Sequence, residues 1–202
     1  MTLVLAAALV AAPVTLEADP NHSTVGFSVK HMVVTTVRGQ FPKFSSTLTF
    51  DKENPAKGSV ELKVDPASIN TNNEKRDGHL KSADFFDVQK CPEMTFKSKK
   101  VEKSGDKYKV TGDLSMHCVT KPVVLEASFT DNPIKSPFGT MVYPASATGK
   151  LKRSEWGLTW NKALETGGAM VSDEVNLDLE FEYLPKKAEA TKEAQAETKA
   201  SK

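Results

Sequence analysis

Apolar and polar residues alternate along most of this chain, and this alternation constrains its fold more than any other feature. Successive side chains of a strand point to opposite faces, so an alternating segment forms a strand with one apolar face. In the first such segment, Val25, Phe27 and Val29 share one face. The pattern recurs over residues 25–31, 44–50, 60–64, 94–98, 110–116, 123–129, 142–151 and 175–181. The sequence therefore predicts an all-β protein with eight strands.

Short turns that contain Gly, Asn or Pro join many of these strands, as Ser104–Asp106 does between the fourth and the fifth. Strands joined in this way pair as antiparallel neighbours. Eight of them can close into a barrel, which removes the exposed edges and encloses room for one small ligand. A sandwich of two sheets has the same periodicity, so alternation alone leaves both folds open.

Residues 65–90 interrupt the alternation and predict short helical insertions between strands. Thr71 or Asn72 can cap a short helix, because both side chains can accept a hydrogen bond from a free backbone N–H group. A second short turn follows and carries Phe85 and Phe86. Insertions of this kind often cover the open end of a barrel. We therefore expect the two phenylalanines to form an apolar plug at the mouth.

The two ends of the chain differ in composition from the middle. Met1–Ala12 is an apolar run with the length of a signal-peptide core, too short to span a membrane. We therefore expect residues 1–18 to be a signal peptide and the protein to be periplasmic or secreted; the alternative is a buried N-terminal helix or strand. Residues 186–202 contain no Val, Ile, Leu or aromatic residue, which predicts a disordered, solvated tail. The barrel domain is then predicted over residues 19–185.

Charge and motifs exclude several classes of function. The chain has 27 basic and 26 acidic residues without a basic patch, which disfavours a nucleic-acid partner. The histidines, His22, His31, His79 and His117, do not have the spacing of metal ligands. No nucleophile motif, phosphate-binding loop or dinucleotide fingerprint is present. We therefore expect no catalytic residue, no metal and no cofactor, so the protein is predicted not to be an enzyme.

Cys91 and Cys118 are the two cysteines, and an exported protein with one pair favours a disulfide. In the expected hairpin, Phe96 lies opposite Leu114. This register would place Cys91 opposite residue 119, one position beyond Cys118. The thiols would then be neighbours on opposite faces, unless a bulge beside Cys91 shifts the register. We predict the disulfide, with a reduced buried pair as the alternative.

An ordered series of motifs covers most of the chain and resembles the YceI-like family of polyisoprenoid-binding proteins. The motifs are DPNHSTVGFSVKH from Asp19, VRGQF from Val37, Phe50-Asp51, SINTNNEKRDGHL from Ser68, FFDV from Phe85, CPEMTFKS from Cys91, TGDL from Thr111, VTKPV from Val119, RSEWGL from Arg153 and DEV from Asp173. Three residues depart from the family pattern: Ser46 and Cys118 replace glycines, and Cys91 replaces an aromatic residue. The departure of both cysteines fits a disulfide particular to this lineage.

The resemblance implies an extended lipocalin-like barrel in the periplasm, which holds a long isoprenoid or a quinone-like amphiphile without inserting stably into a membrane. Related barrels also suggest a homodimer. Apolar burial contributes about 0.8 kcal/mol per methylene, so an apolar interior binds such a chain without a reactive group. We expect core packing for about half of the candidate ligand-binding residues. These are Phe27, Val29, His31, Phe41, Phe44, Leu48, Leu62, Phe85, Phe86, Met94, Phe96, Leu114, Met116, Leu125, Trp156, Leu158 and Trp160.

Two other functions are compatible with these residues. An enzyme acting on an apolar substrate would need Arg76, Asp77 and His79 to converge on the cavity, with at least one shifted pKa. A structural, interaction or stress protein would need a barrel filled by its own side chains, with the charged tail as its binding element. The two alternatives differ from a carrier in what the interior contains.

Overall fold

A computed structural model describes residues 13–51, 54–163 and 169–186 of the 202-residue chain. The strands are β1 (Val14–Ala18), β2 (Thr24–His31), β3 (Thr35–Gln40), β4 (Phe44–Phe50), β5 (Ser59–Val64), β6 (Met94–Ser104), β7 (Lys107–Met116), β8 (Val119–Phe129), β9 (Ile134–Lys135), β10 (Met141–Lys152) and β11 (Val171–Pro185). The helix α1 (Glu74–Lys81) accompanies three short 3-10 helices, η1 (Pro55–Lys57), η2 (Pro66–Ser68) and η3 (Arg153–Trp156).

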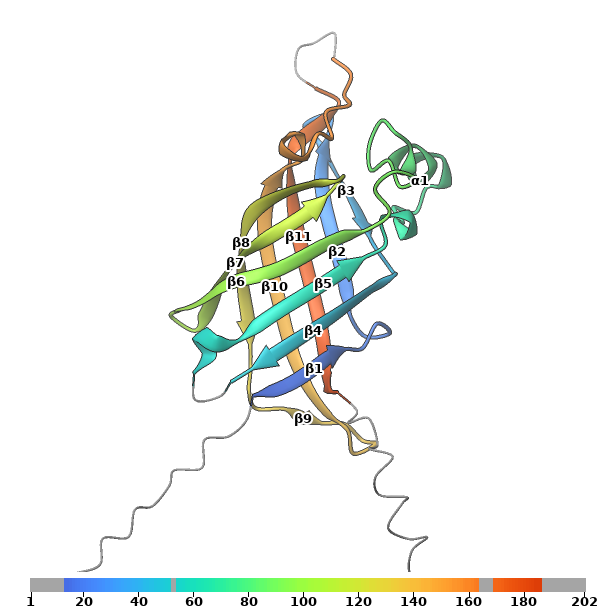
Figure 1. The fold of residues 1–202 in the computed structure, drawn as a ribbon. Helices are drawn as coiled ribbons and strands as arrows, with labels where there is room; N and C mark the ends of the chain where they lie inside the picture. The colour runs from blue at the N-terminus through green and yellow to red at the C-terminus, as the bar shows by residue number, and fades with distance from the viewer. Residues whose placement is uncertain (1–12, 52–53, 164–168, 187–202) are drawn as a thin grey trace, which may run out of the picture.

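Eight strands form a closed ring in the order β1-β4-β5-β6-β7-β8-β10-β11, because β11 pairs with both β10 and β1 (Figure 1). Every pair in the ring is antiparallel. The predicted eight-stranded antiparallel barrel is confirmed, and the sandwich is excluded. The Phe96–Leu114 pairing that the sequence suggested is also present.

The edge of β11 that faces away from β10 has two partners. Its last residues, up to Pro185, pair with β1, whereas 171–180 pair with β2. Among the strands described, β3 pairs with β2 alone. The wall continues from β3 to the 65–90 insertion, where Gln40 and Asn70 exchange backbone hydrogen bonds of 3.0 and 2.9 Å. The barrel is therefore closed by strands at the β1 end and completed by the insertion at the α1 end (Figure 1).

The strands β1, β3 and β9 were not predicted. β1 lies inside the segment predicted as a signal peptide, and its Leu16 is fully buried between β4 and β11. The barrel thus begins at Val14 rather than at Asp19. Residues 1–12, which carry the apolar run of the predicted signal peptide, lie outside the described residues, as does the predicted tail beyond Lys186.

The N-cap of α1 is Asn73, whose side chain accepts a hydrogen bond from the backbone N–H of Arg76 at 3.0 Å. The prediction that Thr71 or Asn72 caps this helix is therefore wrong. Asn72 has a left-handed backbone with φ of 58°, and Thr71 donates from its N–H and its hydroxyl to Asp77. The physical reason is that Thr71 closes the loop in front of the helix, which moves the helix start one residue later.

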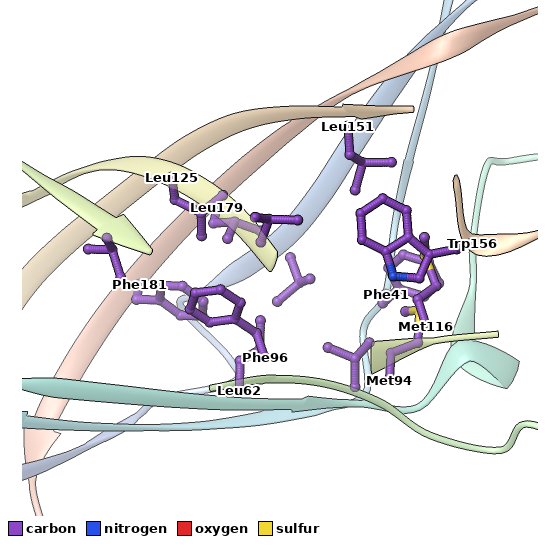
Figure 2. Close-up of a cluster of buried hydrophobic side chains, with 14 of the residues drawn as sticks. Phe41, Leu62, Met94, Phe96, Met116, Leu125, Leu151, Trp156, Leu179 and Phe181 are labelled. Carbon is purple, nitrogen blue, oxygen red and sulfur yellow. The ribbon is translucent and has the colours of Figure 1, made fainter. Parts of the chain in front are cut away.

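Alternation builds the core, because inward residues of the strands face one another across the barrel. Figure 2 shows two groups of these side chains: Leu62, Phe96, Leu125, Leu179 and Phe181 on one side, and Phe41, Met94, Met116, Leu151 and Trp156 on the other. All of these residues are at most 9% exposed. These side chains do not fill the barrel evenly along its axis, and the interior is divided into the two cavities described below.

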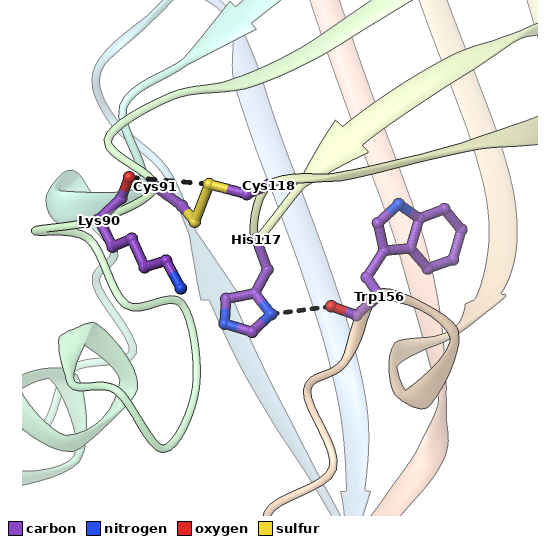
Figure 3. Close-up of a disulfide and its surroundings, with 5 residues drawn as sticks. All are labelled: Lys90, Cys91, His117, Cys118 and Trp156. Carbon is purple, nitrogen blue, oxygen red and sulfur yellow. Dashed lines mark hydrogen bonds between the residues drawn. A yellow bond between two sulfur atoms is a disulfide. The ribbon is translucent and has the colours of Figure 1, made fainter.

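Cys91 and Cys118 form a disulfide, with their Cα atoms 5.4 Å apart (Figure 3). The bulge expected beside Cys91 is absent from the described pairing, where the register shift lies between Ser98 and Lys100. The sequence argument that placed the two thiols on opposite faces of a hairpin does not apply to them. Cys91 precedes β6, and Cys118 occupies the β7–β8 turn with φ of 58°. The disulfide ties the end of the 65–90 insertion to the wall.

Candidate functional site

The barrel contains a cavity of about 550 Å³ at the α1 end, lined mainly by apolar side chains. Strands β2, β3, β5, β6, β7, β8, β10 and β11 supply its walls, and the 65–90 and 153–160 segments supply its rim. Most of the candidate residues lie on its surface. These are Phe27, Val29, His31, Phe41, Leu62, Phe85, Phe86, Met94, Phe96, Leu114, Met116, Leu125, Leu158 and Trp160.

Three candidate residues lie elsewhere, and the predicted lining is corrected at these positions. Leu48 lines a second, smaller cavity of about 110 Å³ toward the β1 end. Phe44 and Trp156 line neither cavity. The ring of Phe44 packs edge-on against Phe181, with 6.0 Å between the centroids. Trp156 is 1% exposed and donates its indole N–H to the carbonyl oxygen of Leu114 at 3.0 Å. Both are therefore packing residues of the wall.

Several lining residues were missed by the sequence reasoning. Val123 shares the inward face of its predicted strand with the chosen Leu125, and Leu177 and Leu179 alternate along the predicted strand 175–181, so the same alternation could have found them. Val37 and Met170 gave no comparable signal. Val37 belongs to the unpredicted strand β3, and Met170 stands just outside β11.

Four apolar side chains line both cavities and separate them: Leu62, Phe96, Leu125 and Leu179. We call these four residues the partition; Figure 2 labels all of them. Glycines on neighbouring strands make room for two of them. A Cβ atom at Gly112 would lie 2.5 Å from Cζ of Phe96, and one at Gly149 would lie 2.6 Å from Cδ2 of Leu125. The partition thus depends on backbone positions without side chains.

Polar groups gather at the rim beside α1. Arg76 donates from Nε to the Thr71 hydroxyl at 2.8 Å and from Nη2 to the Thr71 carbonyl at 2.7 Å. Asp77 accepts from Thr71, as described above, and His79 bonds through Nε2 to Asp84 at 2.8 Å. All three residues that an enzyme would need therefore have partners within the insertion, which they hold in shape.

His79 also connects the two rim segments. Its ring meets those of Phe85 and Trp160 edge-on, with centroids 5.0 and 4.7 Å away. Phe85 and Trp160 are themselves 5.2 Å apart between centroids. Phe86 packs edge-on against Phe41 at 5.6 Å, so the insertion also contacts the chain that follows β3. The predicted aromatic plug is thus built from both rim segments.

Arg153 anchors the 153–160 segment below the rim. It is 6% exposed and donates from Nε to the carbonyl of Ser172 and from Nη1 to that of Trp160, each at 3.0 Å, and also to the carbonyl of Leu158. Burial lowers the pKa of Arg153, and the nearby Asp173 carboxylate opposes this shift. The guanidinium is therefore committed to holding this segment against β11.

The smaller cavity has one buried polar pair. The hydroxyl groups of Ser46 and Tyr183 are 2.7 Å apart, and Ser46 donates to the carbonyl of Glu61 at 3.0 Å. Since the serine proton is used there, Tyr183 donates to Ser46. Burial raises the pKa of Tyr183 to about 12, and the hydrogen bond between Tyr183 and Ser46 opposes this shift. Ser46, which the resemblance marked as a replacement of glycine, thus makes a contact that glycine could not.

The described residues contain no group of three or more His, Cys, Asp or Glu side chains arranged to hold a metal ion. Of the histidines, His31 lines the cavity, His22 bonds to Asp19 at 2.8 Å, and His117 donates from Nδ1 to the carbonyl of Trp156 at 2.8 Å (Figure 3). Among the helices of the described ranges, none has both the length and the apolar character needed to cross a membrane.

The chain is similar to known proteins over most of its length. A family model for the YceI-like domain matches residues 16–183. Protein YceI of Escherichia coli O157:H7 is 35% identical over 182 residues, which cover 90% of this chain and 92% of that protein.

Two solved structures have the same fold. The structure of BcnA from Burkholderia cenocepacia is 25% identical with a TM-score of 0.71, over 81% of this chain and 98% of BcnA. A polyisoprenoid binding domain from Saccharophagus degradans, implicated in plant cell wall breakdown, is 15% identical with a TM-score of 0.59, over 86% of this chain and 99% of that domain. At that identity the second likeness shows the fold alone.

Proposed function

This chain belongs to the YceI-like family, and we propose that it binds one long isoprenoid lipid, or a quinone-like amphiphile, in the barrel interior and carries it through the periplasm. The observation that carries the proposal is the apolar cavity of about 550 Å³ at the α1 end. Its size lies within the range typical of pockets for small ligands. A barrel filled by its own side chains would have no such space.

The distribution of polar groups supports an amphiphile with an apolar tail. The deep walls carry Leu, Val, Met and Phe, whereas Asn73, Lys75 and Arg76 lie on the rim. Each buried methylene contributes about 0.8 kcal/mol, so a prenyl tail in the deep part supplies most of the affinity. A polar headgroup would then lie between the rim residues. The solved polyisoprenoid binding domain has the same fold.

We propose a binding protein rather than an enzyme. Arg76, Asp77 and His79 are the polar residues that the enzyme alternative requires, and each has a hydrogen-bonding partner inside the insertion. These hydrogen bonds hold the insertion at the rim in shape. The disulfide and the apolar N-terminal run agree with the oxidising periplasm as the site of action.

Native mass spectrometry of the protein purified from its own periplasm tests the proposal. We expect one prenyl lipid per chain, which organic extraction then identifies; the same spectrum reports whether the protein is a homodimer. Protein that emerges without lipid and takes up no added prenyl quinone would contradict the carrier function.

Val123 and Val124 provide a matched pair of variants on β8. Val123 lines the cavity and is 9% exposed, whereas its neighbour Val124 points outward and is 47% exposed. Val123→Trp should fill the cavity and remove the bound lipid, while Val124→Trp should retain it. Circular dichroism confirms that both variants are folded. Equal lipid content in the two variants would place the lipid outside the cavity.

A further inference from the structure

The turn between β2 and β3 exposes three consecutive apolar residues. Met32, Val33 and Val34 are 48%, 76% and 78% exposed. An isolated exposed apolar residue is ordinary, but a run of three on a projecting turn is not. We call these three residues the hairpin tip.

Turn chemistry does not explain this sequence. Met32 and Val33 are the central residues of a β-turn in which the N–H of Val34 donates to the carbonyl of His31 at 3.2 Å. Their φ angles are 50° and 62°, the left-handed region that a type I′ turn requires at both central positions. Asn-Gly is the favoured pair there, and a β-branched valine is among the least favoured residues. The hairpin tip therefore retains apolar side chains at a cost to its own stability.

The hairpin tip lies beside the rim of the cavity. His31, the last residue of β2, lines the cavity and pairs with Val171, which lines it too. The backbone N–H of Met32 donates to the carbonyl of Met170, another lining residue, at 2.8 Å. The tip is thus adjoined by cavity-lining residues at the end of β2 and at the start of β11.

Lysines lie beside the hairpin tip, and the nearest exposed carboxylates of β11, Asp173 and Glu174, are bonded to Ser154 and Lys150. Lys30 precedes the tip and is exposed, and the carbonyl of the exposed Lys162 accepts a hydrogen bond from Met170 at 2.9 Å. The sequence from residue 20 to residue 50 contains no Asp or Glu, so both strands of the hairpin lack carboxylates. Apolar side chains next to lysines are the combination that binds the interface of an anionic bilayer.

We propose that the hairpin tip docks on the surface of an anionic phospholipid membrane and brings the cavity rim into contact with lipid. This inference rests on the proposed function, because docking at the rim serves a protein whose cargo resides in a membrane. Three side chains enter the interface while the barrel stays outside, so the contact is reversible. An isoprenoid chain can then pass between bilayer and cavity with less exposure to water.

Vesicle flotation with the full chain tests the proposal, using phosphatidylcholine vesicles with and without phosphatidylglycerol and free of prenyl lipid. We expect binding that requires phosphatidylglycerol and weakens as salt rises. The decisive variant combines Met32→Asn, Val33→Gly and Val34→Thr. It should bind vesicles at least about tenfold more weakly, yet melt at the same or a higher temperature because Asn-Gly suits the turn.

Phe138 supplies the control, because it is 95% exposed in the β9–β10 turn at the opposite end of the barrel. Phe138→Asn should leave vesicle binding unchanged. The proposal is overturned if the wild type does not bind vesicles, if Phe138→Asn weakens binding as much as the triple variant, or if the triple variant only converts a dimer to a monomer. Uptake of prenyl quinone from solution is measured on the same samples, so loss of docking and absence of cargo binding are distinguished.

Discussion

Removal of the Cys91–Cys118 disulfide should cost the barrel a calculable part of its stability. The two cysteines are 27 positions apart. A cross-link over a loop of that length lowers the entropy of the unfolded chain, which corresponds to about 3.5 kcal/mol at 25 °C. For a domain of this size each kcal/mol shifts the melting temperature by about 2–4 °C. Reduction should therefore lower the melting temperature by about 7–14 °C.

The measurement is differential scanning calorimetry of the wild type with and without reductant, alongside the double variant Cys91→Ala and Cys118→Ala. Alanine is preferred to serine because Cys91 is 4% exposed and a buried hydroxyl would lack a partner. The double variant should melt near the reduced wild type and should not respond to reductant. Thiol labelling of denatured protein verifies that reduction is complete.

Two results would refute this reasoning. If complete reduction shifts the melting temperature by less than about 3 °C, the loop-entropy argument fails for this chain. If the denatured wild type labels equally with and without reductant, the disulfide does not form in the protein. A loss within the expected range would show that the 65–90 insertion needs this covalent tie to the wall.

Three further predictions concern the interior and the ionisable groups. Phe96→Ala should join the two cavities and lower the free energy of unfolding by about 3–5 kcal/mol. The variant should then bind a quinone chain one isoprene unit longer at least about tenfold more tightly, since five more buried carbons offer up to about 4 kcal/mol. Calorimetry of quinone binding measures this difference. Tyr183 should titrate near pH 12 in the folded protein, because its pKa is raised to about 12. The stability that this shift contributes, at most about 3 kcal/mol, is fully present below pH 10 and is lost as pH rises from about 10 to 12. Tyr183→Phe should remove the corresponding step from the ultraviolet titration. Asp19 raises the pKa of His22 above 6.5, mainly through a hydrogen bond. Asp19→Asn should therefore return the NMR titration midpoint of His22 toward 6.5, and an unchanged midpoint would contradict this contact.

The strands that sequence predicted share a physical property that the missed ones lack. β2, β5 and β11 each present several large apolar residues at every second position. β3 has only Val37 as a large apolar residue, and β1 has Leu16 as its one buried residue. These strands form because long partners offer them backbone hydrogen bonds, and this tertiary cause leaves a weak pattern in the local sequence.

The candidate site was predicted less completely than the fold for a related reason. Alternation tells which side chains point inward, but it does not tell whether an inward side chain meets another side chain or open space. Phe96 faces both cavities, whereas the equally apolar Phe44 fills its position against Phe181. The difference depends on glycines of neighbouring strands, such as Gly112, which pairs with Ser98 and leaves room for the ring of Phe96.

The double pairing of β11 gives the two ends of the barrel different mechanical properties. At the β1 end, opening the ring requires breaking a ladder between strands. At the α1 end, the described backbone hydrogen bonds between β3 and the insertion are the two between Gln40 and Asn70. We therefore expect the β2–β3 hairpin to separate from the insertion more readily than neighbouring strands of the ring separate from one another. Amide hydrogen exchange should then be faster at Gln40 and Asn70 than along the β1 ladders, and this seam is where we expect a bulky chain to enter from the side.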